Sequence, residues 1–233
     1  MNPKSETIRN MFTRIAPRYD FLNRALSIRI DQLWRKDAVA YLPEGKDLRV
    51  LDLCAGTLDL TVEVLRQRPK AHVTSLDFSE AMLLAGKPKI PEDQKKQVEL
   101  KVGDAMDLDF PKESFEGVIC GFGIRNVVDN ERALQEVYRV LKPGGRIIIL
   151  EFFRPTHWSS KLFHGTYGKW VLPYVGSWLS KDPEAYQYLF DSIQKYYSRE
   201  EFERLLKKNS FELIASEPLT SHVASIVVGK KRI

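Results

Sequence analysis

The feature that most constrains the fold is a pair of strand-like segments at the end of the chain. Phe211–Ser216 and Val223–Gly229 are both largely apolar, and the linker between them, EPLTS, is short. Parallel neighbours need a crossover of about a dozen residues or more, usually a helix, and this linker has no room for one. The two segments are therefore expected to pair as antiparallel strands.

Upstream of this pair, short apolar runs alternate with segments of helical periodicity. The expected strands are Leu48–Leu53, His72–Asp77, Val98–Val102, Phe115–Cys120 and Arg146–Glu151, and the expected helices are Leu58–Arg68, Ser79–Ala85, Asn130–Leu141 and Arg199–Lys208. The last helix begins with the capping-box pattern of Ser198 and Glu201. Such alternation predicts a parallel sheet with right-handed crossovers. We therefore predict an α/β fold whose seven-stranded, mostly parallel sheet ends in an antiparallel hairpin.

Two regions fall outside this alternation, and we expect both to be part of one domain, 1–233. Residues 1–46 carry apolar side chains at helical spacing, which predicts a helical cap. Up to Lys36 this cap holds eight Lys and Arg against three Asp and Glu, so it either packs on the domain or also touches a membrane or a bulky apolar ligand. Residues 153–197 are rich in aromatic residues and interrupted by Pro and Gly, which predicts an inserted group of short helices.

The composition excludes several classes of protein. A net charge of +5 is too small to indicate nucleic-acid binding by itself. No stretch resembles a signal peptide, and no apolar run reaches the length of about 18 residues that spans a bilayer. Cys54 and Cys120 lie in apolar runs and are expected to be buried, reduced thiols. We expect a cytoplasmic protein and leave open a peripheral contact at the inner face of the membrane.

Suitable ligand-binding residues follow three expected strands, whose carboxyl ends would meet at one edge of the sheet. Gly56 allows close backbone approach at a tight turn, where a helix N-terminus can face a carboxylate or phosphate. Asp77, 21 residues beyond Gly56, can accept both hydroxyls of a ribose, although a helix-capping aspartate gives the same pattern. Asp104 and Ala105 follow the third strand. A nicotinamide cofactor would use the first two positions but would not explain the third or the terminal hairpin.

A parallel sheet that ends in an antiparallel hairpin resembles the Rossmann-like class I S-adenosylmethionine-dependent methyltransferases. In similar enzymes an acidic residue, here Asp52, begins the first motif, and glycines follow at alternate positions that here hold Cys54, Gly56 and Leu58. The end of the third strand holds the adenine in such enzymes. The resemblance implies S-adenosyl-L-methionine as the cofactor. The cofactor-binding residues that it implies are Asp52, Gly56, Thr57, Asp77, Phe78, Asp104, Ala105 and Gly121.

Four longer stretches narrow the resemblance to one family. They are YDFLNRALSIRIDQLWR, GFGIRNV, RVLKPGGRIIILEF and LPYVGSWLSKDPEAYQYLFDSI. Together they resemble the ubiquinone/menaquinone biosynthesis C-methyltransferases of the UbiE/MenG type, which include the demethylmenaquinone methyltransferases, over nearly the whole chain. KPGG is shared by many methyltransferases and is expected to turn the preceding helix into the fifth strand. The chain departs from the family pattern at Asp31 (usually His), Leu58 (Gly), Gly121 (often Ser) and Phe153 (Ser).

The family resemblance implies methyl transfer to a ring carbon of a prenylated quinol, either demethylmenaquinol or the related benzoquinol. The sulfonium methyl is already electrophilic, so no metal is expected, but the ring carbon reacts well only when a neighbouring phenol loses its proton. We assign catalytic roles to Arg125, which can stabilise a phenolate, and to Asn126, which can orient a hydroxyl or a water. The alternative for Arg125 is a salt bridge to Asp129 or a helix-capping contact.

Further residues are assigned to the acceptor. Tyr19 and Asn23 are expected to line the same pocket, unless they belong only to a helix junction. Tyr174, Tyr186 and Tyr188 are expected to line an apolar channel for the prenyl tail, although aromatic runs more often form plain core. His157 and His164 lack the companions that a metal site needs.

Three other functions remain as alternatives. The first is methylation of another small molecule, such as a phenol, an amine or a sterol. The second, methylation of RNA or DNA, has little support because an NPPY-like motif is missing where the chain has GFGI. The third is a non-catalytic S-adenosylmethionine-binding subunit of a quinone-biosynthesis assembly, which the missing glycines would suit. We expect no nucleic-acid partner and leave a homodimer open.

Overall fold

The computed structural model of the protein describes residues 3–16, 19–20, 24, 27, 29–158 and 183–233. Its strands are β1 (Arg49–Leu53), β2 (His72–Asp77), β3 (Val98–Val102), β4 (Phe115–Gly121), β5 (Leu141–Glu151), β6 (Phe211–Leu219) and β7 (Ala224–Lys231). Its longer helices are α1 (Pro3–Ile15), α3 (Ile30–Ala40), α4 (Asp59–Gln67), α5 (Glu80–Gly86), α6 (Asn130–Val140), α9 (Pro183–Lys195) and α10 (Arg199–Lys208). Short 3₁₀ turns include η2 (Lys87–Lys89), η3 (Glu92–Gln97) and η4 (Ile124–Asn126).

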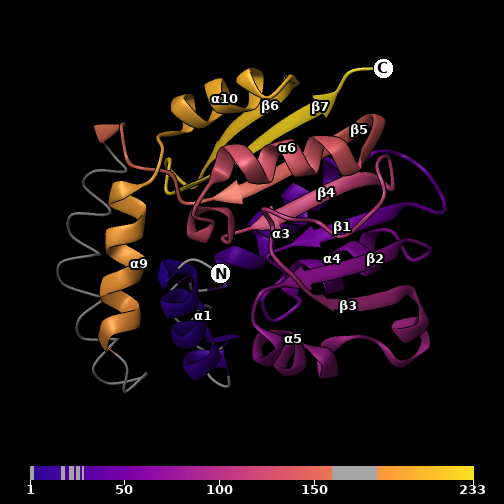
Figure 1. The fold of residues 1–233 in the computed structure, drawn as a ribbon, viewed down its shortest axis with the longest axis horizontal. Coiled ribbons are helices and arrows are strands. Elements are labelled where there is room, and N and C mark those ends of the chain that lie inside the picture. Colours follow the sequence, from indigo (N-terminus) through magenta and orange to yellow (C-terminus); the bar gives the residue numbers. More distant parts are fainter. Residues whose placement is uncertain (1–2, 17–18, 21–23, 25–26, 28, 159–182) are drawn as a thin grey trace.

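The strands form one seven-stranded sheet in the order β3-β2-β1-β4-β5-β7-β6 (Figure 1). All neighbours are parallel except β7, which runs antiparallel to both β5 and β6. The β6–β7 connection is a tight turn in which Thr220, Ser221 and His222 all have positive φ. The fold predicted from the short linker and the alternating strands and helices is confirmed.

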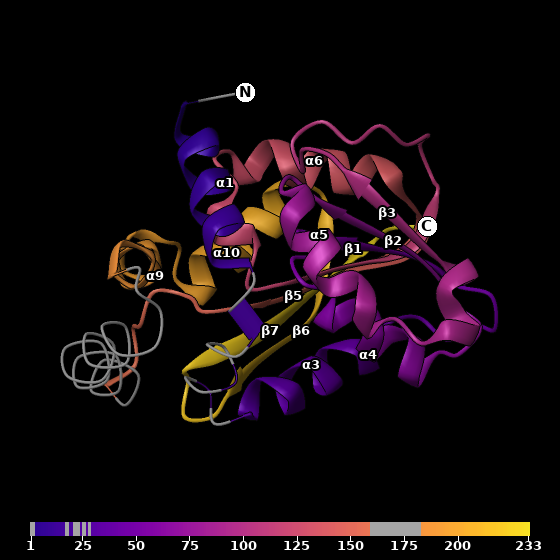
Figure 2. The ribbon, with the colours of Figure 1, turned by 90° about the horizontal axis from the view of Figure 1, so that it is seen from below.

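Helices cover both faces of the sheet, which explains why its central strands are apolar almost throughout (Figure 2). Successive side chains of a strand point to opposite faces. In β1, Val50 packs with α3, α4 and α5, whereas Leu51 and Leu53 pack with α6 and α10 on the other face. The capping box of Ser198 and Glu201 begins α10 as predicted.

The KPGG stretch differs from the expected simple turn. Helix α6 ends at Val140, and β5 begins at the next residue, several positions earlier than predicted. The register against β4 then shifts, so KPGG forms an irregularity within the strand. Gly144 has φ 78°, and a Cβ on Gly145 would lie 2.8 Å from the Lys142 carbonyl oxygen. The two glycines are therefore needed to accommodate the shift in register.

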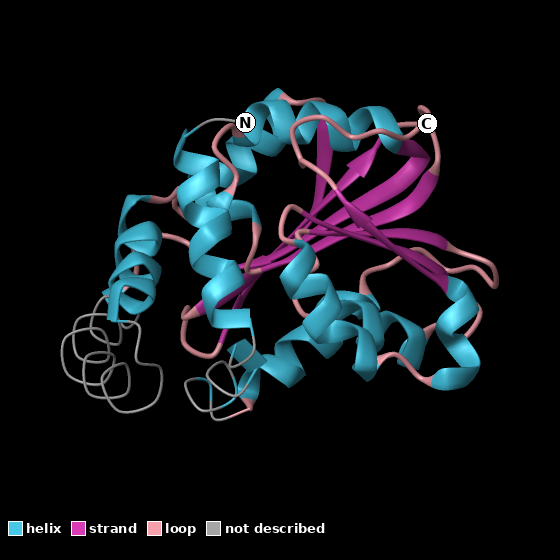
Figure 3. Cartoon of the chain, turned by 60° about the horizontal axis from the view of Figure 1, so that its bottom comes forward, coloured by secondary structure: helices cyan, strands magenta, loops and turns pink. Residues whose placement is uncertain are grey.

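Helices α1 and α9 lie side by side beyond the carboxyl ends of the parallel strands (Figures 1 and 3). Apolar side chains of α1 form a separate cluster with Met82 of α5, and Tyr188 of α9 packs against this cluster. Asn23 and Tyr174 lie outside the described residues, and the division into a cap, 1–46, and an insertion, 153–197, stays a prediction. In the part of the chain that the structure describes, no helix has the length and apolarity needed to cross a membrane.

Candidate active site

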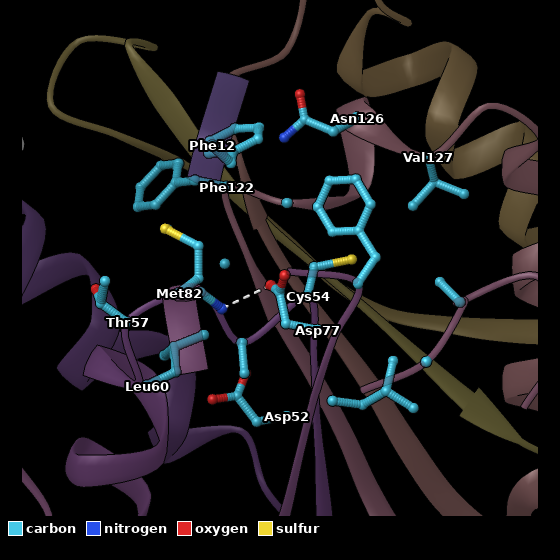
Figure 4. Close-up of a pocket in the computed structure, with 18 of the residues that line it drawn as sticks. Phe12, Asp52, Cys54, Thr57, Leu60, Asp77, Met82, Phe122, Asn126 and Val127 are labelled. Carbon is cyan, nitrogen blue, oxygen red and sulfur yellow. Dashed lines mark hydrogen bonds between the residues drawn. The ribbon is translucent and has the colours of Figure 1, made fainter. Parts of the chain in front are cut away.

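A pocket lies at the carboxyl ends of the central strands, next to the point where the strand order reverses between β1 and β4 (Figure 4). Open α/β sheets bind their ligands at this kind of position. Helix α1 contributes Phe12 and Arg9 to its wall. All eight predicted cofactor residues line it: Asp52, Gly56, Thr57, Asp77, Phe78, Asp104, Ala105 and Gly121.

The loop after β1 keeps a left-handed backbone at all three alternate positions. The φ angles are 57° at Cys54, 52° at Gly56 and 67° at Leu58. A residue with a Cβ adopts this conformation at a cost of about 1 kcal/mol or more, which explains why glycine is the usual choice. The two non-glycine residues therefore strain the loop.

The Asp77 carboxylate fixes this loop from the end of β2. One oxygen, Oδ2, accepts the Gly56 N–H at 2.8 Å (Figure 4). The other, Oδ1, accepts the Ser79 N–H at 2.8 Å. Burial raises the pKa of Asp77 to about 6, although these N–H donors oppose the rise. The helix-cap alternative is wrong, because Ser79 occupies the N-cap position of α5.

Asp52 is the buried carboxylate with unused bonding capacity. Its Oδ2 accepts the Thr61 hydroxyl at 2.6 Å, whereas Oδ1 has no partner among the described residues. Burial raises the pKa of Asp52 to about 7. Since an unpaired buried acceptor is costly, and Asp52 lines the pocket, this oxygen fits a ligand that brings a hydrogen-bond donor.

The remaining predicted cofactor residues complete the walls of the pocket. Asp104 Oδ1 accepts the Met106 N–H at 2.9 Å, which folds the chain after β3 around the pocket. The Thr57 hydroxyl donates to Asp20 at 2.5 Å and so joins the loop after β1 to the N-terminal segment. Phe78 packs edge-on against Phe12 of α1, with ring centroids 6.3 Å apart.

The structure separates Arg125 from Asn126, although both lie in η4 just after β4. Arg125 is buried and forms an ion pair with Glu151, with Nη1 2.8 Å from Oε1. The alternative predicted for Arg125 was a salt bridge to Asp129. Arg125 does form a salt bridge, but with Glu151, because the Asp129 side chain caps α6 by accepting the Arg132 N–H. Asn126 lines the pocket, and its Oδ1 accepts the Tyr188 hydroxyl at 2.9 Å.

Among the predicted acceptor residues, Tyr19 lines the pocket and packs edge-on against Phe12. Tyr186 lies in α9, but its side chain is outside what the structure describes. Two residues of this region went unrecognised in the sequence: Glu151, and Ser192, whose Oγ accepts the Arg125 Nε–H at 3.3 Å. A glutamate at the end of an apolar strand is a signal that could have identified Glu151, because a buried carboxylate needs a partner.

Three departures from the family pattern have local structural reasons. A Cβ on Gly121 would lie 2.7 Å from Leu60 Cδ1, so a serine there would require Leu60 to move. Phe153 is buried and stacks on Tyr196, with ring centroids 6.0 Å apart. Asp31 forms a buried ion pair with Arg35, which itself lines the pocket.

The strained loop gives a prediction about stability. Leu58→Gly would relieve about 1 kcal/mol of strain but would remove a fully buried leucine, and comparable losses cost about 2–5 kcal/mol. We expect urea denaturation to show a net destabilisation of about 2 kcal/mol. Cys54→Gly, at a half-buried position, should stay within about 1 kcal/mol of the original protein. A Leu58→Gly variant as stable as the original would mean that the relief of backbone strain fully offsets the lost packing.

Asp52 gives a prediction about pH. Its pKa rises from 3.8 when unfolded to about 7 when folded, so the folded state binds the extra proton between these values. The stabilisation of the folded state by protonated Asp52 is therefore complete below about pH 4 and is lost as pH rises through about 7. Without cofactor, Asp52→Asn should match the original protein near pH 4 and exceed its free energy of unfolding by up to about 4 kcal/mol near pH 8. Denaturant titrations showing the same difference at both pH values would contradict this.

Known proteins resemble this chain in sequence and in fold. The profile of the ubiE/COQ5 methyltransferase family matches residues 1–231. A ubiquinone/menaquinone biosynthesis C-methyltransferase UbiE of Geobacter sulfurreducens is 40% identical over 99% of this chain and 91% of its own length. A demethylmenaquinone methyltransferase of Listeria welshimeri is 35% identical over 91% of this chain and 90% of its own.

Solved structures agree on the fold. A SAM-dependent methyltransferase of Thermotoga maritima superposes with a TM-score of 0.67 at 23% identity, covering 96% of this chain and 99% of its own. The [4+2]-cyclase SpnF superposes with a TM-score of 0.70 at 16% identity, covering 100% of this chain and 98% of its own. At such identities these likenesses concern the fold alone, but the family profile and the curated relatives extend over nearly the whole chain. The chain therefore belongs to the ubiE/COQ5 methyltransferase family, as its four motifs predicted.

Proposed function

We propose that this protein transfers the methyl group of S-adenosylmethionine to a ring carbon of a prenylated quinol, either demethylmenaquinol or the related benzoquinol. The observation that carries the proposal is the pocket where the strand order of the sheet reverses, which is lined by carboxylates from three strand ends and by the Asn126 amide. The relatives are named for ubiquinone and menaquinone biosynthesis and for demethylmenaquinone, and these names supply the class of acceptor.

The protein is a methyltransferase that uses S-adenosylmethionine, because it belongs to this family, and its residues fit that cofactor. Asp77 would accept the ribose hydroxyls, Asp104 and the Ala105 N–H would hold the adenine, and the unpaired Oδ1 of Asp52 would accept the amino group of the methionine part. Gly56 lets the backbone approach closely. When bound, the cofactor supplies a methyl group that is already electrophilic.

The acceptor side of the pocket has a different chemistry. The ring carbon becomes a good nucleophile when a neighbouring phenol loses its proton, and a donor near the resulting oxygen stabilises the anion. We infer that Asn126, whose amide lines the pocket, acts as that donor. Arg125 cannot be the proton acceptor because it stays protonated, and its guanidinium is engaged by Glu151 and Ser192. Arg125 thus acts as a positioning residue for η4.

Apolar side chains lie beside Asn126 in the pocket, with Phe12 and Val127 among them (Figure 4). They suit a hydrophobic quinol better than a soluble, charged acceptor. The prenyl channel formed by Tyr174 and Tyr186, the role of Asn23, a homodimer and a peripheral contact with the inner face of the membrane stay predictions.

The proposal is tested by product analysis. The purified protein is incubated with methyl-labelled S-adenosylmethionine and a panel of demethylated benzoquinols and naphthoquinols, kept reduced. We expect mass spectrometry to show one labelled methyl group on one quinol class, and NMR to place it on a ring carbon. Methylation of oxygen or nitrogen on a soluble phenol or amine would instead favour another small-molecule methyltransferase. Cofactor binding without transfer to any acceptor would favour a non-catalytic subunit.

Substitutions on the two sides of the pocket should affect different parameters, kcat on one side and the cofactor Kd on the other. Asn126→Ala removes the donor to the acceptor oxygen, so kcat should fall by about 10²-fold or more while the cofactor Kd changes little. Asp77→Ala removes the proposed ribose contact and the support of Gly56, so the cofactor Kd should rise about tenfold or more. Calorimetry and initial rates measure the two effects. If Asn126→Ala weakens cofactor binding as much as Asp77→Ala does, the assignment of sides is wrong.

A further inference from the structure

Tyr188 contacts the proposed acceptor site through its hydroxyl, a role that goes beyond lining a prenyl channel. It lies in the middle of α9, and its Oη is 2.9 Å from Asn126 Oδ1. An amide oxygen only accepts hydrogen bonds, so the tyrosine hydroxyl must be the donor. The oxygen end of the Asn126 amide is therefore held on the side of α9.

In the structure, this bond occupies the oxygen end of the amide and leaves the nitrogen end for the pocket. With Oδ1 directed to Tyr188, the nitrogen end of Asn126 is turned toward the pocket and Phe12 (Figure 4). The backbone of Asn126 is fixed as well, because its N–H donates to the Gly123 carbonyl oxygen at 3.0 Å. The side chain thus presents N–H donors, rather than an acceptor oxygen, to a ligand.

Helix α9 is itself held in place near Tyr188. Ser192 lies one turn further along the helix, and its Oγ accepts the Arg125 Nε–H at 3.3 Å. Arg125 in turn is paired with Glu151 and donates to the Phe122 carbonyl oxygen at 2.5 Å. Tyr188 is half-buried, and burial raises its pKa, so the hydroxyl keeps its proton at neutral pH.

We propose that Tyr188 is a positioning residue for methyl transfer, whose hydroxyl orients the Asn126 amide so that an N–H donor faces the ring oxygen of the acceptor. This inference rests on the proposed function for the identity of the acceptor as a phenol. Negative charge develops on that oxygen as the phenol is deprotonated, and a preoriented N–H stabilises it. A reversed amide would place its oxygen against the developing charge and would oppose the reaction.

The test compares the original protein with Tyr188→Phe, which keeps the ring and removes only the hydroxyl. We expect kcat to fall about tenfold, since one orienting hydrogen bond of about 1.4 kcal/mol is lost, while the acceptor KM and the cofactor Kd change by less than about twofold. The rising limb of the kcat–pH profile should move to higher pH, because the phenolate is less stabilised. A change in stability alone would not move this limb.

Tyr196→Phe is a matched control. The Tyr196 hydroxyl also donates to an asparagine, Asn130 Oδ1, at 2.6 Å, but neither residue lines the pocket. The control should lose a similar hydrogen bond and similar stability, yet keep its kcat and pH profile. In an Asn126→Ala background, Tyr188→Phe should cause no further loss of kcat, because the amide that it orients is gone.

A second readout needs no turnover. In protein labelled with ¹⁵N at asparagine, the Asn126 side-chain amide signal is identified by its loss in Asn126→Ala. Tyr188→Phe should shift or broaden this signal, whereas Tyr196→Phe should leave it unchanged.

The possible failures can be told apart. If the original protein methylates no prenylated quinol, the proposed function fails, and the NMR signal still decides whether Tyr188 orients the amide. If the original protein is active and Tyr188→Phe keeps its kcat, its pH profile and the Asn126 signal, the role of Tyr188 is overturned.

Discussion

The buried ion pair between Arg125 and Glu151 is the interaction on which the arrangement of the active site depends. The guanidinium contacts three parts of the chain: the end of β4 through the Phe122 carbonyl, the end of β5 through Glu151, and α9 through Ser192. A buried pair of this kind adds little net stability compared with apolar residues, but losing one partner costs about 3–5 kcal/mol. Its main effect is therefore to fix the position of η4 and α9 against the sheet.

The loop after β1 shows how the fold tolerates unusual residues. Leu58 keeps a backbone conformation that favours glycine, and its side chain is fully buried in the core beneath the pocket. Burial of a leucine is worth about 1.5–3 kcal/mol, which exceeds the strain of about 1 kcal/mol. Asp77 holds the loop through the Gly56 N–H. The missing glycines therefore leave a loop that still has the geometry of a cofactor loop.

The sequence was sufficient to predict the sheet and the residues that line the pocket at the ends of its strands, but not the partners of Arg125. Local signals determine the former: apolar runs, a short linker, and suitable residues at the ends of three strands. For Arg125 the nearest carboxylate in the sequence is Asp129, whereas the actual partner, Glu151, lies 26 residues away and becomes a neighbour only because β4 and β5 pair. The contact of Tyr188 with Asn126 likewise depends on how α9 packs, which no local pattern determines.

Adjacent residues in a 3₁₀ turn point about 120° apart, so Arg125 and Asn126 cannot both face one ligand. The turn directs Arg125 into the interior and Asn126 into the pocket. Because Arg125 is engaged by Glu151, the side-chain donor that η4 presents to the pocket is the Asn126 amide. The carboxylates of Asp52 and Asp77 lie close together in the pocket, while Phe12 and Val127 lie beside Asn126 (Figure 4). Under the proposed function, apolar side chains beside one oriented amide donor suit a neutral, hydrophobic quinol, which develops its charge only as it reacts.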